Sequence, residues 1–479
     1  MNDTPQAQAS GWKFPKAFWT ANAVELLERA AWYGVFVAIT LYLSRILAFT
    51  DIEAATVSGV FTAGLYFLPT FAGAYADRIG YRAALLLAFG LLTVGYASMW
   101  VLPTLLESAG LAEYGREVTF TGLENSWHHW LFIPVMLVIM VGGSFIKSVI
   151  TGTVARETTE VNRARGYSIF YAMVNVGAFS GKTIVKPLRE SMGNEGLIVL
   201  NLFAAAMTLI AFFLVLVFYR AAKSESEGKR LSEIWASFLA VLSRGRLITL
   251  IVIITGFWMV QHQLYASMPK YILRMVGEGA SPSWYANVNP AVVVLTVGLV
   301  THMMAKRTAL FSMTFGMFIM PISALCMASG NMFSGDSISV FGLFEMHPVA
   351  LMMLVGIGFQ GLAESFISPR FLEYFSLQAP KGEEGLYLGF SHLHSFISAI
   401  VGFIMSGLLL ERFCPDPKTL SAAEQAQRLE SLAGNGAMPE AYAHAHYLWF
   451  TFVGIALVSA VALIVFGFVT RRMDAKKAA

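Results

Sequence analysis

Charged residues and cysteines are both scarce in this chain of 479 residues. Asp, Glu, Lys and Arg together make up 13% of the sequence, whereas a soluble globular domain carries about 25%. The two cysteines, Cys326 and Cys414, provide neither a disulfide framework nor the spacing of a metal site. The net charge is only +3, so nothing indicates a nucleic acid or another polyanion as partner. The scarcity of charge indicates that most side chains face something other than water.

The sequence also lacks the motifs of common enzymes. It contains no phosphate-binding glycine loop, no His, Cys, Asp and Glu cluster at metal-ligand spacing and no nucleophile motif. The polar start, MNDTPQAQASGWKFPKAFW, lacks the basic region and the short apolar stretch of a cleaved signal peptide. We therefore expect no enzyme, no metal and no organic cofactor, and we expect the first apolar segment to act as the targeting signal.

Apolar residues dominate what is present. They make up 56% of the chain, and the mean hydropathy is +0.62. About twelve segments approach the roughly 20 residues that cross a bilayer. We expect these spans at residues 18–48, 54–76, 82–103, 129–155, 164–188, 196–219, 247–273, 284–305, 308–328, 347–377, 386–411 and 446–470. The pattern predicts an all-α membrane protein that crosses the bilayer many times.

The basic residues indicate how these spans are oriented. Lys and Arg gather in one set of loops, at positions such as Arg78, Arg163 and Lys306, while the opposite loops hold few, such as Arg116 and Lys418. Cytoplasmic loops carry the excess of Lys and Arg in membrane proteins. We therefore predict that both termini are cytoplasmic and that the protein lies in the inner (plasma) membrane.

A polar stretch from Arg220 to Arg246 divides the spans into two sets. We predict an N-terminal bundle of six helices at 1–220, a cytoplasmic linker at 221–246 and a C-terminal bundle of six helices at 247–479.

The segment GAYADRIGYR, after the second span, has the pattern G-x-x-x-D-R-x-G-x-R, which places Asp77, Arg78, Gly80 and Arg82. A tight turn with an acid–base pair can latch one helix end against a neighbour. This pattern resembles the signature loop of the major facilitator superfamily. The resemblance implies two helical bundles with the cargo site between them, near the membrane midplane.

Ionisable residues inside the expected spans form a second signal, because a charge at membrane depth is costly and is usually paired and functional. Glu25, Glu28 and Arg29 share one helix face in the first span, since positions three and four apart are neighbours. Lys147 in the fourth span could balance the excess carboxylate, and Glu364 stands alone in the tenth. A carboxylate–lysine pair that opens and closes would bind and release a proton. The alternative is that these charges only hold helices together through ion pairs and have no role in transport.

Seven segments, in order along nearly the whole chain, resemble the motifs of the proton-dependent oligopeptide transporter family. These segments are ELLERAAWY from Glu25 to Tyr33, LYFLP with Tyr66, the span with Lys147, RGYSIFYAMVNVGAF with Asn175, FWMVQHQ with Trp258, WYANVNP with Asn289 and AESFISP with Glu364. The resemblance implies proton-driven import of di- and tripeptides by alternating access. It implies a proton-linked cluster of Glu25, Glu28, Arg29 and Lys147, and a cargo site lined by Tyr33, Tyr66, Asn175, Asn289 and Glu364. We add His262 and Glu364 to the candidate proton-coupling residues, and Lys147, Trp258 and Ser368 to the candidate cargo site.

The sequence departs from the family pattern at informative positions. Phe36 stands where many bacterial members have a second arginine, and His262 stands where the family usually has an acid. We hypothesise that His262 takes over part of the proton relay, since imidazole titrates near neutral pH; the alternative is a histidine that only forms hydrogen bonds. Two alternatives are open for the missing arginine: either Lys182 or Lys186 replaces it, or the cargo is a modified or bulkier peptide.

Three other functions remain open at this point. They are a related carrier for a modified peptide or an anion, a drug–proton antiporter of the same superfamily, and a sensor without transport activity, for which we find no soluble signalling domain. For the peptide carrier we expect protons as coupling ion, a small peptide and the lipid bilayer as partners, and a monomer.

Overall fold

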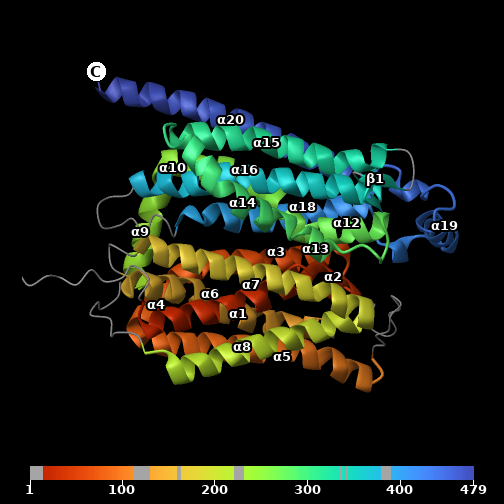
Figure 1. Cartoon of the computed structure of the whole chain (residues 1–479), viewed down its shortest axis with the longest axis horizontal. Coiled ribbons are helices and arrows are strands. Elements are labelled where there is room, and N and C mark those ends of the chain that lie inside the picture. Colours follow the sequence, from red (N-terminus) through yellow and green to blue (C-terminus); the bar gives the residue numbers. More distant parts are fainter. Residues whose placement is uncertain are drawn as a thin grey trace, which may run out of the picture.

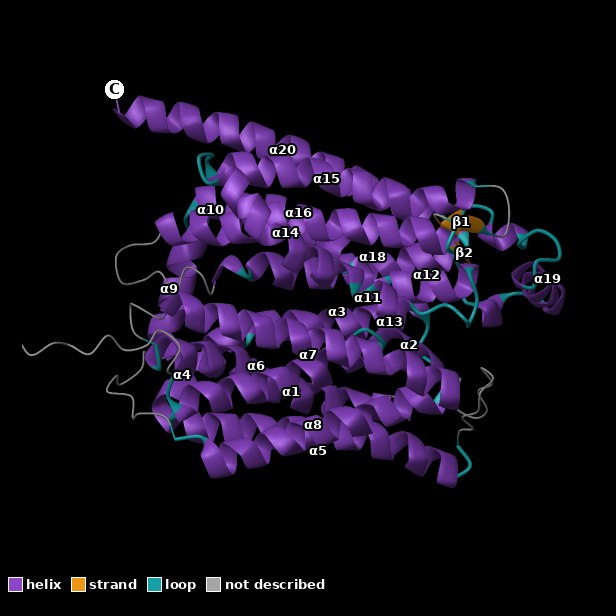
Figure 2. Ribbon diagram, viewed as in Figure 1, coloured by secondary structure: helices purple, strands orange, loops and turns teal. Residues whose placement is uncertain are grey.

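The computed structural model describes residues 14–111, 130–158, 163–220, 231–333, 337–340, 342–378 and 390–478. Nearly all of its elements are helices that run side by side along one axis (Figure 1). Figure 2 shows a small two-stranded sheet at one end. We call this end the α19 side and the opposite end, where the short helix α9 crosses the bundle, the α9 side.

The first half of the chain contains eight helices in its described part. They are α1 (Lys16–Phe36), α2 (Ile39–Arg45), α3 (Asp51–Phe67), α4 (Pro69–Ile79), α5 (Tyr81–Ser108), α6 (Phe132–Arg156), α7 (Arg163–Met192) and α8 (Glu195–Phe218). Helix α1 packs against α7 and α8, and α5 packs against α6 and α8. These contacts make the first half one helical bundle.

The second half begins with the linker helix α9 (Leu231–Leu242). Its other helices are α10 (Gly245–Gln261), α11 (Gln263–Ala266), α12 (Met268–Met275), α13 (Pro282–Tyr285), α14 (Val288–Met304), α15 (Ala309–Ser329), α16 (Pro348–Gln378), α18 (Leu393–Phe413), α19 (Ala422–Leu432) and α20 (Tyr447–Ala478), with short 3₁₀ turns η2 (Gly330–Met332), η3 (Pro417–Thr419) and η4 (Glu440–Tyr442). Strand β1 (Ile338–Val340) pairs antiparallel with β2 (Phe344–Met346). Helix α15 packs against α16 and α20 in the second bundle.

Nine helices in the described residues are long and apolar enough to cross a membrane, and the bent pair α1 and α2 makes a tenth. The pair α3 and α4, and helix α7, occupy two more of the expected spans but fall outside that criterion. The first span is bent by 46° between Phe36 and Ile39. The expected span at 247–273 is likewise divided, into α10, α11 and α12. The expected helix positions agree with the structure, whereas the breaks within them were not predicted.

The two halves touch most extensively between α3 and α18, and they also touch between α7 and α13, between α2 and both α11 and α12, and between α4 and the linker helix α9. A Cβ added at Gly59 of α3 would lie 2.9 Å from the Ala399 carbonyl oxygen, and one at Gly407 of α18 would lie 2.8 Å from the Asp51 carbonyl oxygen. Both distances are too short for a real side chain, so glycine is needed for this close approach. Where α13 meets α7, Trp284 donates a hydrogen bond to the Thr183 carbonyl oxygen of α7.

The turn between α4 and α5 contains the predicted signature loop. Gly80 has a φ of 87°, a left-handed conformation that favours glycine. Arg82 donates a hydrogen bond of 2.7 Å to the Leu216 carbonyl oxygen at the end of α8, so the loop does fasten neighbouring helix ends. Arg78 is exposed, and the side chain of Asp77 lies outside the described part of the structure.

Candidate functional site

A cavity of about 410 Å³ lies between the two halves. Side chains from both bundles line it. They include eleven of the twelve residues expected at the site, namely Glu25, Glu28, Arg29, Tyr33, Tyr66, Lys147, Trp258, His262, Asn289, Glu364 and Ser368. Asn175 is half-buried on α7 and is not among the described residues that line the cavity, although its neighbour Val174 is. The structure therefore gathers side chains that are hundreds of residues apart in the sequence.

The first wall of the cavity is the charged face of α1. Arg29 Nε lies 3.3 Å from Glu25 Oε1, one helical turn away, and the Arg29 guanidinium also pairs with Glu28. Both carboxylates are buried, with 4% and 3% of their residue surface exposed. Glu25 Oε2 is buried without a hydrogen-bond partner. One guanidinium thus serves two carboxylates, which leaves an excess negative charge and an unsatisfied oxygen.

Lys147 on α6 faces this cluster across the cavity but contacts the other half of the chain. Its Nζ atom lies 3.5 Å from His392 Nε2, at the residue that precedes α18, and 5.9 Å from the centre of the Tyr66 ring. Among the described residues, no carboxylate lies within ion-pair distance of Lys147. The sequence led us to expect a Glu–Lys pair, whereas the contact in this conformation is a lysine–histidine pair.

The opposite wall carries Glu364 on α16. Its Oε2 atom accepts hydrogen bonds from Gln261 Nε2 at 2.6 Å and from Asn289 Nδ2 at 3.4 Å. No Lys or Arg in the described part of the chain lies within ion-pair distance of this carboxylate. Helix α16 continues through Pro369 to Gln378 without a break. Glu364 is therefore oriented by two amides while its charge remains available to a cation in the cavity.

Three imidazoles occupy the same region of the second half. His262 is buried and its Nδ1 atom lies 3.4 Å from the Ser398 hydroxyl. His394 stacks on Trp258, with 5.2 Å between ring centres, and lies 6.1 Å from His392. In the described residues, no group of three His, Cys, Asp or Glu side chains could hold a metal ion. These contacts give His262 a hydroxyl partner and place His392, rather than His262, beside a charged group.

Phe36, which stands where many bacterial members of the resembled family have a second arginine, belongs to an aromatic cluster. Phe36 stacks on Trp32 with 4.7 Å between ring centres and lies 4.9 Å from Tyr265 of the second half. Trp32 in turn lies 5.6 Å from Phe61. The cavity therefore has an apolar corner where the family pattern would place a cation.

The two unusual lysines of α7 have different surroundings. Lys182 is 2% exposed, donates a hydrogen bond of 3.3 Å to the Ala286 carbonyl oxygen, and lies 5.0 Å from the Tyr33 ring and 5.6 Å from the Tyr265 ring. No carboxylate among the described residues pairs with it. Lys186 lies farther toward the α19 side, where it pairs with Glu190 at 3.5 Å. Lys182 is thus a buried cation directly behind two rings that line the cavity.

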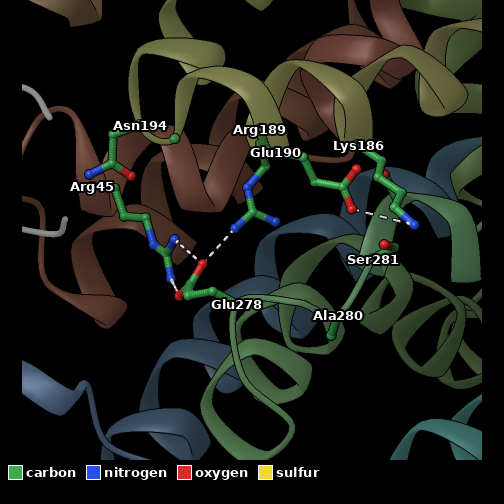
Figure 3. A pocket seen from close by; sticks show the side chains of 10 residues that line it. Arg45, Lys186, Arg189, Glu190, Asn194, Glu278, Ala280 and Ser281 are labelled. Carbon is green, nitrogen blue, oxygen red and sulfur yellow. Dashed lines mark hydrogen bonds and ion pairs between the residues drawn. The ribbon is translucent and has the colours of Figure 1, made fainter. Parts of the chain in front are cut away.

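A second, smaller pocket of about 250 Å³ lies on the α19 side, between the two halves. Figure 3 shows Arg45 and Arg189 of the first half pointing toward Glu278 of the second half. Arg45 donates to Glu278 at 2.9 Å and Arg189 donates at 2.8 Å. Burial would raise the pKa of Glu278, but the hydrogen bond and charge of Arg45 and the charge of Arg189 outweigh burial and lower this pKa.

A deeper ion-pair network joins the halves on the same side. Asp51, at the start of α3, accepts hydrogen bonds from Lys270 at 2.7 Å and from Arg274 at 2.7 and 2.9 Å. Arg274 also donates to Asp416 at 3.0 Å. Asp51, Lys270 and Arg274 are 7%, 3% and 5% exposed. Arg428 of α19 donates to the carbonyl oxygens of Leu273 and Arg274, which holds α19 against the end of α12. This Asp51 network was not predicted from the sequence.

Aromatic side chains join the halves on the α9 side. Phe238 of the linker helix lies 6.0 Å from Phe67 of the first half and 5.3 Å from Phe390 of the second. Phe67 also lies 5.4 Å from Phe396 of α18. The central cavity is therefore flanked by inter-half contacts on both sides, ionic on one and largely aromatic on the other.

A family model and curated relatives match this chain. The model of the Major Facilitator Superfamily matches residues 23–344. Dipeptide and tripeptide permease A of Proteus mirabilis is 24% identical over 215 residues, which cover 44% of this chain and 39% of that protein. Dipeptide and tripeptide permease B of Shigella dysenteriae is 24% identical over 448 residues, which cover 82% of this chain and 86% of that protein. The chain thus matches only about 39% of the length of the first of these relatives.

Solved structures share the fold at low sequence identity. One match is a structure described as giving insights into substrate recognition in proton dependent oligopeptide transporters. It has a TM-score of 0.68 and 18% sequence identity to this chain, and the match covers 95% of this chain and 99% of that chain. A peptide transporter POT in complex with sulfate has a TM-score of 0.68 and 17% identity, with coverage of 95% and 94%.

These likenesses confirm the predicted all-α fold and the resemblance to the peptide transporter family. The superfamily model, moreover, covers more than half of the chain. The chain is a multi-pass membrane protein that belongs to the Major Facilitator Superfamily.

Proposed function

We propose that this protein is a proton-coupled symporter that imports di- and tripeptides or peptide-like solutes by alternating access. The observation that carries this proposal is the pair of opposite charges on the two walls of one cavity. Glu364, on the second half, lacks a cationic partner among the described residues, and the contacts of the Lys147 ammonium, on the first half, are there with a histidine and an aromatic ring. A peptide zwitterion carries an ammonium that suits Glu364 and a carboxylate that suits Lys147.

The cavity size and polar lining fit such a cargo. Small-molecule sites occupy about 300–1,000 Å³ and combine apolar walls with a few placed polar groups, and this cavity measures about 410 Å³. Asn289 offers both a donor and an acceptor to a peptide bond. The names of the permeases that the chain resembles support a peptide cargo, and the fold supports rocking of two halves around a central site.

The proton would act on the α1 cluster. Glu25 and Glu28 share the single guanidinium of Arg29, so a proton on one carboxylate lets the other keep the ion pair. A buried carboxylate without a full partner favours its neutral form. In this scheme the proton is the coupling ion, and neither an organic cofactor nor a metal takes part. One chain encloses the whole cavity, which is why we propose a monomer as the working unit, in the inner membrane with both termini cytoplasmic.

The test is uptake of labelled dialanine into proteoliposomes under an imposed proton gradient. The protein should concentrate the peptide in the direction of proton flow. Glu28→Gln and Lys147→Ala should abolish concentrative uptake, while exchange between two peptide pools continues. Concentrative uptake that is unimpaired in both variants, or movement of cargo against the proton flow as in an antiporter, would overturn the proposal.

A bulkier or modified peptide is a second candidate cargo, and the aromatic corner favours it. Phe36, Trp32 and Tyr265 offer an apolar surface where the family pattern places an arginine. A thermal-shift competition screen with a library of di- and tripeptides separates the two. Stabilisation by peptides with large aromatic side chains, and none by dialanine, would identify the bulkier class.

A further inference from the structure

The contact between Lys147 and His392 joins the two halves of the protein at the cavity. Lys147 lies on α6 of the first half, and His392 immediately precedes α18 of the second. Their Nζ and Nε2 atoms are 3.5 Å apart. The ring of His392 also stacks on Tyr66 of α3, with 6.4 Å between centres and 24° between planes. His392 therefore touches two helices of the opposite half.

This contact lies toward the α9 side of the cavity. His392 stands at the end of α18 that neighbours Phe390, and Phe390 packs on the linker helix α9 through Phe238. Phe67, the residue that follows Tyr66, packs on Phe238 as well. The lysine–histidine contact thus belongs to the set of interactions that close the α9 side.

The hydrogen-bond donors and acceptors of lysine and histidine determine the protonation state that this contact requires. A lysine ammonium has three donors and no acceptor, so Nε2 of His392 must accept, and the ring must be neutral with its hydrogen on Nδ1. A proton added to Nε2 removes the acceptor and places two cations about 3.5 Å apart. Protonation of one imidazole therefore turns an attraction between the halves into a repulsion.

The surroundings favour the neutral ring while the contact holds. Among the described residues, no carboxylate lies within ion-pair distance of His392, and the positive end of α18 disfavours a cation there. The titratable and charged groups around the contact are Lys147 on α6, Tyr66 on α3, His262 between α10 and α11, His394 on α18, and Glu25 and Arg29 on α1. The proton can stay on His392 only when Lys147 has moved away.

We propose that His392 is a positioning residue that couples protonation to opening of the α9 side. A proton that reaches Nε2 breaks the contact with Lys147 and releases the halves from each other on that side. When the proton leaves to the water beyond, the neutral ring accepts again from Lys147 and the side closes. This inference rests on the proposed function, because it supplies the link between proton movement and cargo release.

The experiment measures opening without any cargo. Spin labels on Ala83→Cys of α5 and Leu377→Cys of α16, both exposed, report the separation of the halves near the α9 side. Cys326 and Cys414 are replaced beforehand. In the wild-type background, the ratio of open to closed distances should rise as pH falls from about 8 to about 5, by up to about tenfold per pH unit for a single coupled proton.

Two histidine variants separate a switch from a structural role. His392→Gln keeps an oxygen that can accept from Lys147 but binds no proton, so its distances should be closed and independent of pH. His394→Gln, two residues away and without a contact to Lys147, should keep the wild-type response. If His392→Gln does not yield a monodisperse protein, Lys147→Gln serves instead, and it should likewise abolish the pH response.

The outcomes distinguish this inference from the proposed function. A wild-type response that persists in His392→Gln, or one that disappears in His394→Gln, would overturn the assignment to His392. Distances that ignore pH in the wild type would overturn it too, even if liposomes still concentrate dialanine. A pH response in a protein that moves no peptide would leave the switch intact and remove the proposed cargo.

Discussion

Replacing Asp51 by Asn should open the α19 side of the protein. Asp51 belongs to the first half, whereas Lys270 and Arg274 belong to the second, so their three hydrogen bonds exist only while this side is closed. The substitution removes the negative charge and leaves two buried cations. Arg274 retains a carboxylate partner, Asp416, whereas Lys270 retains the Ser44 hydroxyl but no carboxylate among the described residues. The substitution therefore destabilises the closed state relative to the open state, because water can solvate both cations once the halves separate.

The burial of this network sets the size of the effect. Removing one partner of a buried ion pair costs about 3–5 kcal/mol. Asp51 is 7% exposed, so the network meets that condition. Because asparagine keeps one acceptor oxygen, we take the lower limit of about 3 kcal/mol. Each 1.4 kcal/mol is a factor of about ten in a population ratio, so the open-to-closed ratio should rise by roughly a hundredfold.

Spin labels on Leu105→Cys of α5 and Leu343→Cys beside the strands, both exposed, measure this ratio. The matched control is Glu278→Gln in the outer pocket. Glu278 has 56% of its side chain exposed, and an exposed ion pair contributes about 0–1 kcal/mol. The control should therefore change the ratio by no more than about fivefold.

Equal distances in the wild type and in Asp51→Asn would refute the reasoning, as would a larger effect in Glu278→Gln. A double variant checks that charge is the cause. With Lys270→Gln added to Asp51→Asn, the remaining Arg274 keeps Asp416, so the combined effect should be smaller than the sum of the single ones.

Three further predictions follow from the same structure. Because the Arg45 hydrogen bond and the Arg189 charge lower the pKa of Glu278 against the effect of burial, this ion pair should persist at pH values where an ordinary glutamate is already protonated; titrated α19-side distances in detergent would show it. Gly181→Ala should lower the melting temperature, because the added Cβ would lie 2.2 Å from the Ala30 carbonyl oxygen, an overpacking that costs about 1–3 kcal/mol, whereas Gly298→Ala, with open space around it, should not. Lys182→Met should raise the melting temperature by removing a buried cation without a carboxylate partner, as thermal unfolding would report.

Sequence reasoning located the helices because membrane thickness sets a length that apolar runs must meet. It also placed eleven residues of the cavity lining, and the ionisable ones among them, such as Glu25, Lys147 and Glu364, turn inward because they are too costly to face lipid. Helix breaks were harder to predict. The bend after Phe36 and the division of the seventh span at His262 leave no mark in the apolar runs, and both lie where the halves meet, as Phe36 packs on Tyr265.

The pairing of distant charges could not be predicted for the same reason. Asp51 and Lys270 are 219 residues apart, and nothing in either segment specifies the other. One signal was present: Lys270 and Arg274 lie one helical turn apart at the edge of an apolar run, so they share a face and imply an anion opposite. Lys147 shows the converse, because its charge predicted a carboxylate partner while the fold supplied His392.

The two closures of the cavity differ in the chemistry that can undo them. On the α19 side the contacts are ion pairs between carboxylates and Arg or Lys, groups that keep their charge over the physiological pH range. On the α9 side, the described residues form aromatic contacts and one lysine–histidine pair, and imidazole is the side chain that changes charge near neutral pH. A proton can therefore loosen the α9 side while the α19 side stays closed. If the proton opens only the α9 side, the α19 side must be opened by something else, and a charged cargo that competes for Arg45, Lys270 or Arg274 fits that role.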